Sequence, residues 1–381
     1  MPGPLEGLTV LELGTIGPVP FAAMLLADLG ADVIRVERVG GDDGVGPRRD
    51  LDPVLRNRRS IAVDLKHPDG VGSLLLLVEQ VDVVLEGFRP GVAERLGVGP
   101  EECLKRNPGV VVGRMTGWGQ DGPNAHTAGH DINYIALTGA LNAIGRRDEA
   151  PLPPLNLVGD YGGGSMFLVF GVLAALFEKS RSGQGQVIDA AMIDGAAVLM
   201  TLFYGMLADD RWKDERGVNV LDTGAPYYAT YETSDGKYIA LGSIEPQFYR
   251  ILLTSLDLAE DPLFADQNDR TKWPGMAERL REEFLGKTRQ DWCDLLEATD
   301  ACFAPVLSMQ EAPQHPQMIH RRNFIEVEGM TQPAPAPKFS RTPAAFPTGP
   351  VVPGRDTADV LSGAGFSAEE IAALRAARAV E

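Results

Sequence analysis

Strand and helix signals alternate through the first 115 residues, and this alternation limits the possible folds more than any other feature. Short β-type runs occur at residues 8–13, 33–36, 61–65, 81–85 and 110–115. Helical segments at residues 20–29 and 70–80 lie between some of them, and Gly30 ends the first helix. Strands that alternate with helices pair in parallel and form an α/β layer. Such a sheet places ligands beyond the carboxyl ends of its strands.

A smaller α+β domain is predicted further along the chain, since 381 residues are enough for two domains. Residues 227–233 and 238–241 alternate around Asp235-Gly236, which is typical of a hairpin turn. Charge-rich helical segments follow at residues 276–285 and 290–298. The proline-rich residues 333–353 predict an extended connector, and residues 367–380 predict a helix with a capping box.

Composition excludes several classes of protein. The formal net charge of −18 argues against a nucleic-acid binder, which would carry a basic face. The three cysteines match no zinc or redox spacing, which favours a reducing compartment, and we expect a cytoplasmic protein. No signal peptide is visible, and the apolar residues 166–177 are too few to span a bilayer. These residues predict a buried helix, so we expect no membrane span.

A local excess of basic residues stands out in this acidic chain. Residues 48–66 contain six basic side chains against three acids: Arg48, Arg49, Arg56, Arg58, Arg59 and Lys66. Arg35 and Arg38 precede the cluster, and Arg89 and Arg95 follow it. A phosphorylated ligand needs such groups for charge-assisted hydrogen bonds. A solvated, salt-bridged face explains the cluster equally well, and counting charges does not separate the two hypotheses.

Two segments about thirty residues apart carry the best candidates for catalysis. In the first, His130 follows Gly129 and precedes a predicted helix over residues 132–144, with Asp131 in its first turn. In the second, Asp160 precedes the glycines at 162–164, and a second helix is predicted after them. A histidine and a carboxylate suit general acid–base work on one substrate carbon. The N-terminus of a helix favours a neutral imidazole and supplies amide donors.

Simpler interpretations exist for each of these residues. Asp160 could be an ordinary N-cap. The glycines that follow it remove side chains and cost conformational entropy, which favours close approach of a ligand to the backbone. His126 is the rival histidine, but it lies in a polar loop. Glu245, taken alone, is typical of a turn. The turn at residues 14–20 could receive a phosphate, although a plain strand–helix turn explains it better.

Taken together, these residues and several motifs resemble the class III CoA-transferase superfamily, and within it the members that racemise 2-methylacyl-CoA thioesters. The resemblance runs from Leu5 to about Thr342 and includes both catalytic segments. It is also carried by Gly17-Pro18, residues 30–37, Arg56-Asn57-Arg58-Arg59, Asp64-Leu65-Lys66, residues 86–91, Gly224-Ala225-Pro226-Tyr227-Tyr228 and residues 244–249. Each motif alone would be weak, but the set is specific.

The resemblance implies an interlocked homodimer of α/β subunits with a Rossmann-like large domain and a smaller α+β domain. The implied large domain covers residues 1–188 and is completed by 332–381. Residues 189–220 and 305–331 would be linkers around a small domain at 221–304. The active site would lie between the large domain of one subunit and the small domain of the other.

The implied reaction is a 1,1-proton transfer at the α-carbon of an acyl-CoA, through an enolate. His130 and Asp160 would be the two bases, with Glu245 orienting His130 and the backbone N–H of Asp131 stabilising the enolate oxygen. Coenzyme A belongs to the substrate, so no separate cofactor and no metal are expected. Its phosphates and nucleotide would be held by seven residues: Ile16, Arg38, Val63, Leu65, Lys66, Arg89 and Arg95.

Two alternatives remain open at this point. In a CoA transferase of the same superfamily, Asp160 would be a nucleophile that forms acyl anhydride and enzyme–CoA thioester intermediates. A non-catalytic acyl-CoA binding protein would need none of the titratable groups. Because a nucleophilic carboxylate needs no basic partner, His130 and Glu245 favour racemisation.

Overall fold

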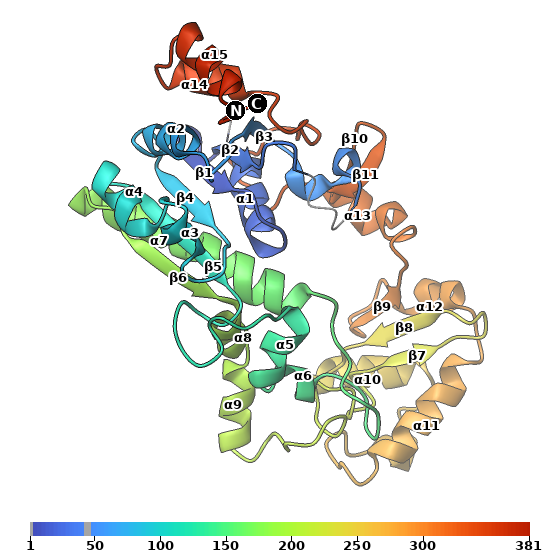
Figure 1. The fold of residues 1–381 in the computed structure, drawn as a ribbon. Helices are drawn as coiled ribbons and strands as arrows, with labels where there is room; N and C mark the ends of the chain where they lie inside the picture. The colour runs from blue at the N-terminus through green and yellow to red at the C-terminus, as the bar shows by residue number, and fades with distance from the viewer. Residues whose placement is uncertain (1–2, 42–46) are drawn as a thin grey trace. The chain divides into compact units, whose positions relative to one another are not determined.

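The computed structural model describes residues 3–41 and 47–381, and the chain divides into two compact units (Figure 1). The first unit comprises residues up to Thr138, Leu155–Leu199 and Arg322–Glu381. The second comprises Gly139–Pro154 and Met200–Arg321.

A six-stranded parallel sheet forms the centre of the first unit, which confirms the predicted α/β class. Its strand order is β3-β2-β1-β4-β5-β6, the order of a doubly wound Rossmann sheet. The strands are β1 (Thr9–Leu13), β2 (Asp32–Glu37), β3 (Arg58–Ala62), β4 (Val83–Glu86), β5 (Val111–Thr116) and β6 (Val187–Ala191). Val10 faces one buried cluster, whereas Leu11 and Leu13 face another. Both faces of the sheet are therefore covered, as a parallel sheet requires.

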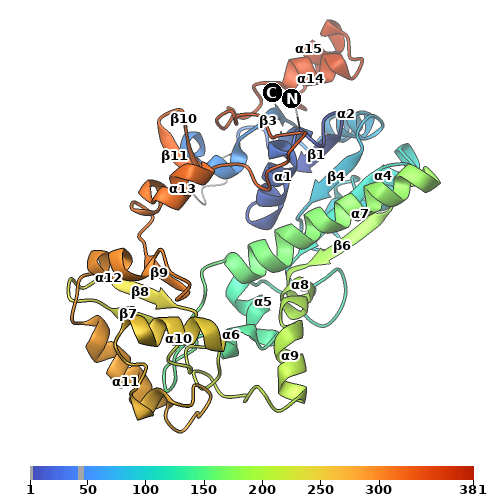
Figure 2. The same ribbon diagram turned by 180° about the vertical axis from the view of Figure 1, so that it is seen from behind.

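Helices cover each face of this sheet. On one face lie α1 (Pro18–Asp28) and α7 (Met166–Ser182), which share a buried cluster with β5, and Figure 2 shows α7 running along β6. The other face is covered by α2 (Pro68–Val78), α3 (Val92–Arg95), α4 (Pro100–Arg106), α14 (Thr357–Gly363) and α15 (Ala368–Ala376). The last helix begins with the predicted capping box at Ser367. The end of the chain returns to the sheet, where Val380 bridges Val63 beside β3.

The second unit is built on an antiparallel sheet, in the order β7-β8-β9. Its strands are β7 (Thr230–Glu232), β8 (Tyr238–Leu241) and β9 (Phe303–Val306), and the predicted hairpin turn at Asp235-Gly236 is confirmed. Its helices are α6 (Ala140–Ala143), α9 (Thr201–Ala208), α10 (Pro246–Ser255), α11 (Trp273–Phe284), α12 (Arg289–Leu296) and α13 (Pro316–Arg321). The chain returns to the first unit at Arg322, where a further hairpin, β10 (Phe324–Val327) and β11 (Met330–Pro333), precedes the extended connector, which contains no helix or strand over residues 334–353.

Two predictions about the catalytic segments are wrong in detail. The helix expected over residues 132–144 is divided into α5 (Asp131–Leu137) and α6, because Gly139 adopts a left-handed φ of 84° between them. The helix expected after the three glycines begins before them. Residues Leu157–Ser165 form a π-helix, η3, that continues directly into α7, so the glycines lie inside a helix.

The continuous helix Leu157–Ser182 is therefore longer than the sequence suggested. With 26 residues and a mean hydropathy of 1.5, it is the one helix among the described residues that could cross a bilayer by length and composition alone. Leu168 and Val172 are buried against the sheet, whereas Phe170 and Phe177 are 71% and 67% exposed. The expectation of a buried helix therefore holds for one face only.

Candidate active site

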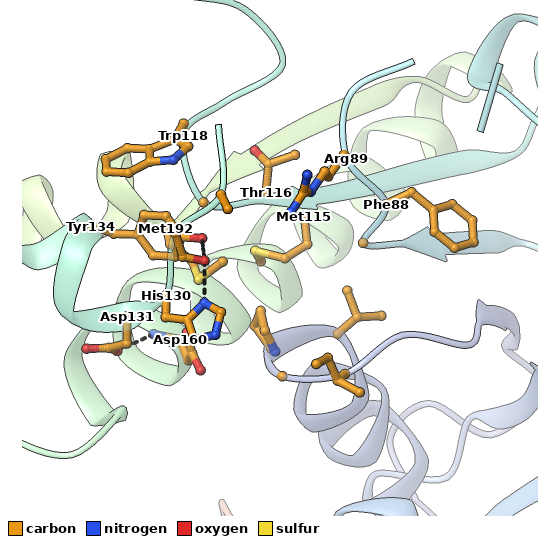
Figure 3. Close-up of a pocket in the computed structure, with 18 of the residues that line it drawn as sticks. Phe88, Arg89, Met115, Thr116, Trp118, His130, Asp131, Tyr134, Asp160 and Met192 are labelled. Carbon is orange, nitrogen blue, oxygen red and sulfur yellow. Dashed lines mark hydrogen bonds between the residues drawn. The ribbon is translucent and has the colours of Figure 1, made fainter. Parts of the chain in front are cut away.

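A cavity of about 470 Å³ opens at the carboxyl ends of three neighbouring strands (Figure 3). Its walls include residues 16–19 after β1, residues 87–90 after β4 and residues 115–118 at the end of β5. Strands β1 and β4 are neighbours in the sheet, and the strand order reverses between them. Ligands of doubly wound sheets bind at this switch point. The remaining walls bring both catalytic segments into the cavity: Ala125, residues 127–131, Tyr134, Asn156, Asp160 and Met192.

His130 lies just before α5, as predicted, with its exposed side chain at the cavity wall. Its backbone N–H donates to Asn133 Oδ1 at 3.0 Å, which fixes the start of the helix. Its Nδ1 lies 2.6 Å from the carbonyl oxygen of Gly129. A carbonyl only accepts hydrogen bonds, so Nδ1 carries a proton. Nε2 is therefore the ring nitrogen that can take up and release a proton.

Tyr134 supports the same carbonyl, a role that sequence reasoning missed. Its hydroxyl donates to Gly129 O, and the dashed lines in Figure 3 show the two bonds converging there. Burial raises the pKa of Tyr134, so the phenol stays protonated and remains a donor. A Cβ at Gly117 would lie 2.0 Å from the Tyr134 ring, and one at Gly129 would lie 2.8 Å from it. The available signal in the sequence was an aromatic residue, Tyr134, four positions after His130, together with the glycines Gly117 and Gly129, which leave room for its ring.

Asp160 lines the same cavity from inside η3, so the N-cap interpretation is wrong. Asn156 Nδ2 donates to its Oδ2 at 3.2 Å. Burial raises the pKa of Asp160, and the charge of Asp131 acts in the same direction, while the bond from Asn156 and the charge of His130 oppose the shift. Asp160 therefore holds a proton at higher pH than a free aspartate does. The only feature of the sequence that could have indicated this role of Asn156 is its position four residues before Asp160.

The glycine run serves helix packing, which corrects the expectation that a ligand approaches its backbone. A Cβ at Gly163 would lie 2.6 Å from the backbone nitrogen of Ala196 in α8 (Met192–Leu199). A Cβ at Gly195 would lie 1.9 Å from Gly163 O. The two helices thus touch backbone to backbone, and only glycine permits this contact. Gly162 is less confined, since a Cβ there would lie 3.0 Å from Leu157 O and 3.2 Å from the Leu199 side chain.

The structure divides the basic residues into two groups. Five arginines are engaged by carboxylates, in the pairs Arg48–Asp50, Arg49–Glu37, Arg56–Asp28, Arg58–Glu12 and Arg59–Asp32. The salt-bridge hypothesis is therefore right for these five. Arg35 also pairs with carboxylates, Glu12 and Glu37. Four other members of this basic group are exposed and make no ion pair with another residue of 3–41 and 47–381: Arg38, Lys66, Arg89 and Arg95. All four were predicted to hold coenzyme A phosphates.

A second cavity, of about 240 Å³, lies at the ends of β2 and β3. Four of the residues predicted to bind the nucleotide and phosphates line it: Arg38, Val63, Leu65 and Lys66. Ile16 and Arg89 line the first cavity instead, together with His130. Phe88 belongs to the walls of both cavities, so the two are neighbours.

Comparison with known proteins assigns the family. The model of CoA-transferase family III matches residues 5–357. The chain belongs to this family. It is 44% identical to alpha-methylacyl-CoA racemase of Mus musculus over 380 residues, covering 99% of this chain and 97% of that protein. It is 32% identical to succinyl-CoA–D-citramalate CoA-transferase of Chloroflexus aurantiacus, covering 100% of this chain and 98% of that protein. The fold resembles the crystal structure of a CAIB/BAIF family protein from Brucella suis, with a TM-score of 0.82, 25% identity, and coverage of 96% of this chain and 100% of that one.

Three further residues were singled out by the family III resemblance. Arg95 and Glu245 line neither cavity, whereas Asp131 lines the first. Arg95 is on α3 and lines neither cavity. Glu245 is in the second unit, exposed, immediately before α10. Its hydrogen bond to His130 stays a prediction. Asp131 is buried at the start of α5, and its main-chain N–H has no acceptor among the described residues.

Proposed function

We propose that the protein is an α-methylacyl-CoA racemase, an isomerase that interconverts the (R) and (S) forms of 2-methylacyl-CoA thioesters. The observation that carries the proposal is one cavity lined by two proton-transfer groups, His130 and Asp160. Nε2 of His130 is free to exchange a proton, and Asp160 holds one more readily than a free aspartate. The 44% identity to a relative named as a racemase, over nearly the whole chain, supports the same assignment.

The reaction follows from these two groups. In one direction, the neutral imidazole of His130 removes the α-proton, and protonated Asp160 returns a proton to the opposite face. In the other direction, the Asp160 carboxylate removes the proton, and the His130 imidazolium returns one. The thioester oxygen carries the negative charge between the two steps. The free N–H of Asp131 supplies a donor for this oxygen.

A raised pKa at Asp160 suits this reversible reaction. Each direction starts from the opposite protonation state of the pair. Burial raises the pKa of Asp160 and brings its proton affinity closer to that of an imidazole. The form with neutral His130 and protonated Asp160 then lies closer in free energy to the form with protonated His130 and ionised Asp160. Neither direction of the reaction therefore starts from a rarely populated protonation state.

The two adjoining cavities offer a path for the whole thioester. We place the coenzyme A nucleotide in the second cavity, against Val63 and Leu65, with its phosphates near Arg38 and Lys66. The acyl group then occupies the first cavity beside Ile16 and His130, past the Phe88 wall common to both. Arg89, on the rim of the first cavity, and Arg95 would hold further phosphate charge.

A single-enantiomer experiment tests the racemase. One enantiomer of a 2-methylacyl-CoA is incubated in D₂O with the enzyme, and with His130→Ala and Asp160→Ala. We expect α-deuterium uptake with loss of enantiomeric purity, and no racemisation by either variant. If the unmodified protein gives neither deuterium uptake nor inversion, the racemase assignment is wrong.

A second arm separates the alternative that family III also contains. An acyl-CoA is mixed with a free carboxylate acceptor, and transfer of coenzyme A is followed. Exchange that is abolished by Asp160→Ala but kept by His130→Ala would identify Asp160 as the nucleophile of a CoA transferase. His130 in the same cavity as Asp160 favours proton transfer, because a nucleophilic carboxylate needs no histidine.

We also propose a homodimer, interlocked as the family resemblance implies. Large apolar side chains lie exposed along one face of α7, at spacings of four, three and four residues: Met166, Phe170, Leu173 and Phe177. A contiguous apolar face of this kind marks an interaction surface, and a second copy is the partner that we infer. Light scattering should give twice the chain mass, and Phe170→Glu with Phe177→Glu should give monomers. A native protein that elutes as a monomer at micromolar concentration would exclude this dimer.

We place the protein in the cytoplasm. Its cysteines, Cys103, Cys293 and Cys302, are all free. Free thiols persist in reducing compartments.

A further inference from the structure

The side chain of Asp131 connects the two segments that carry the proposed bases. Its main chain follows His130 directly and begins α5. Its Oδ2 accepts the backbone N–H of Asp160, in η3, at 2.7 Å. The carboxylate is buried, with the residue 6% exposed, and its Oδ1 has no hydrogen-bond partner among the described residues. One residue thus belongs to one catalytic segment and binds the other.

The packing around this carboxylate is tight. A Cβ at Gly159 would lie 2.5 Å from Asp131 Oδ2 and 2.8 Å from its Cγ. Residue 159 must therefore be glycine for Asp131 to reach the amide of Asp160. The contact with Asp131 explains why glycine precedes Asp160, because the three atoms nearest to a Cβ at position 159 all belong to Asp131.

The bond also satisfies a backbone group that the helix itself cannot. Asp160 lies in the first turn of η3, where N–H groups have no acceptor within the helix. A carboxylate at this end of a helix is favoured by the helix dipole, and its bond to an amide is charge-assisted. Asp131 is thus a cap supplied from a distant part of the chain, 29 residues away.

We propose that the Asp131 side chain is a positioning residue that sets the spacing between His130 and Asp160. This inference rests on the racemase function proposed above. It is separate from the role of the Asp131 backbone N–H at the enolate oxygen. The two bases must face opposite sides of one α-carbon, and a displacement of about 1 Å can cost on the order of 100-fold in rate. A buried hydrogen bond between their segments is suited to hold that spacing.

The carboxylate has an electrostatic effect on Asp160 as well. Burial is the main cause of the raised pKa of Asp160, and the charge of Asp131 adds to it. Removing that charge while keeping an acceptor in place should lower the pKa of Asp160. Position and charge can therefore be separated by Asp131→Ala, which removes both, and Asp131→Asn, which keeps an acceptor oxygen.

The decisive measurement compares inversion with exchange. When one base removes the α-proton in D₂O and the other base is misplaced, the first base returns deuterium to the same face. Deuterium then enters without inversion. A loss of folded protein lowers inversion and exchange equally, so their ratio reports positioning alone. The ratio is measured for both enantiomers of a 2-methylacyl-CoA on the full-length protein.

For Asp131→Ala we expect kcat for inversion to fall about 10- to 100-fold with little change in KM, while exchange without inversion becomes the main product for at least one enantiomer. For Asp131→Asn we expect most of the inversion to return, with the acid limb of the kcat profile moved to lower pH. Asp69→Ala, which removes an exposed first-turn carboxylate from α2, is the matched control and should behave as the native protein.

The inference is overturned if Asp131→Ala keeps the native ratio of inversion to exchange. If that variant does not fold, the same ratio is measured for Asp131→Ser, whose side chain is one bond shorter and cannot keep the 2.7 Å bond to the Asp160 amide, and a native ratio there overturns the inference instead. These outcomes differ from failure of the proposed function, in which the native protein itself shows neither exchange nor inversion.

Discussion

Adding one methyl group at Gly163 should separate the two explanations of the glycine run. The Cβ of Gly163→Ala would lie 2.6 Å from Ala196 N and 2.9 Å from Met192 O, both backbone atoms of α8. Ordinary Cβ contacts begin at 3.4 Å, so α8 and η3 must separate by about 0.8 Å. Neither neighbour is a side chain that could turn away.

The cost follows from this overlap. Overpacking of this kind destabilises by about 1–3 kcal/mol, and the better helix propensity of alanine offsets about 1 kcal/mol of it. We expect a net loss of up to about 2 kcal/mol, which lowers Tm by roughly 2–4 °C per kcal/mol. Asp160 lies three residues before Gly163 in the same helix. Its displacement should lower kcat for racemisation about 10- to 100-fold.

Thermal unfolding and the D₂O racemisation assay measure both effects. Gly72→Ala in α2 is the matched control, because a Cβ there meets nothing within 4 Å. It should stabilise by about 0.5–1 kcal/mol without changing kcat. Gly162→Ala, which meets the backbone only at Leu157 O, 3.0 Å away, and otherwise the movable Leu199 side chain, should fall between the two. If Gly163→Ala is as stable and as active as Gly72→Ala, helix packing does not explain the glycine.

Three further predictions concern charge. Asn156→Ala removes a hydrogen bond that lowers the pKa of Asp160, so the acid limb of the kcat profile should move to higher pH; Asn124→Ala, in a loop outside both cavities, should leave it in place. Asp160→Asn should unfold at a higher temperature than the native protein at pH 7.5. The folded-state pKa of Asp160 is raised, so its ionisation opposes folding above that pKa. The gain in unfolding temperature should therefore vanish as the pH falls to about 4, where Asp160 is protonated in the folded state. An equal gain at pH 7.5 and at pH 4 would contradict this cause. Arg38→Ala should raise KM for coenzyme A thioesters, whereas Arg59→Ala, whose partner is a carboxylate, should change KM little, and equal effects would contradict the division of the basic residues.

The sheet could be predicted because its strands are buried on both faces. Such strands appear in the sequence as short continuous apolar runs, and five of the six lie within a few residues of the runs in the first 115 residues. The helix boundaries near the site were less accessible. Glycine is unfavourable inside helices, so Gly162-Gly163-Gly164 favoured a helix that begins only after them. Contact with α8 overrides this tendency, and that contact is a tertiary property.

The candidate bases could be found from the sequence, but their supporting groups could not. His130 and Asp160 are titratable residues beside glycines, a local signal. The Asn156 bond, the Tyr134 hydroxyl and the Asp131 carboxylate act across turns of helix or between segments. The arginine cluster shows the same limit. Four of its five partners lie earlier in the sequence, so a local count of charges could not assign them: Glu12 on β1, Asp28 at the end of α1, and Asp32 and Glu37 on β2.

The origin of the cavity walls suggests how one fold serves relatives with different named activities. The ends of β1, β4 and β5 form the floor of the first cavity, and the ends of β2 and β3 form the second. These ends are fixed by the sheet. His130 immediately precedes α5 and Asp160 lies in η3, and both segments belong to the long connection between β5 and β6. Substitutions in those two segments can change the chemistry without disturbing the sheet or the second cavity. The Asp131 bond then acquires a particular meaning, because a racemase needs its two reacting segments in fixed register, whereas a carboxylate nucleophile acting alone does not.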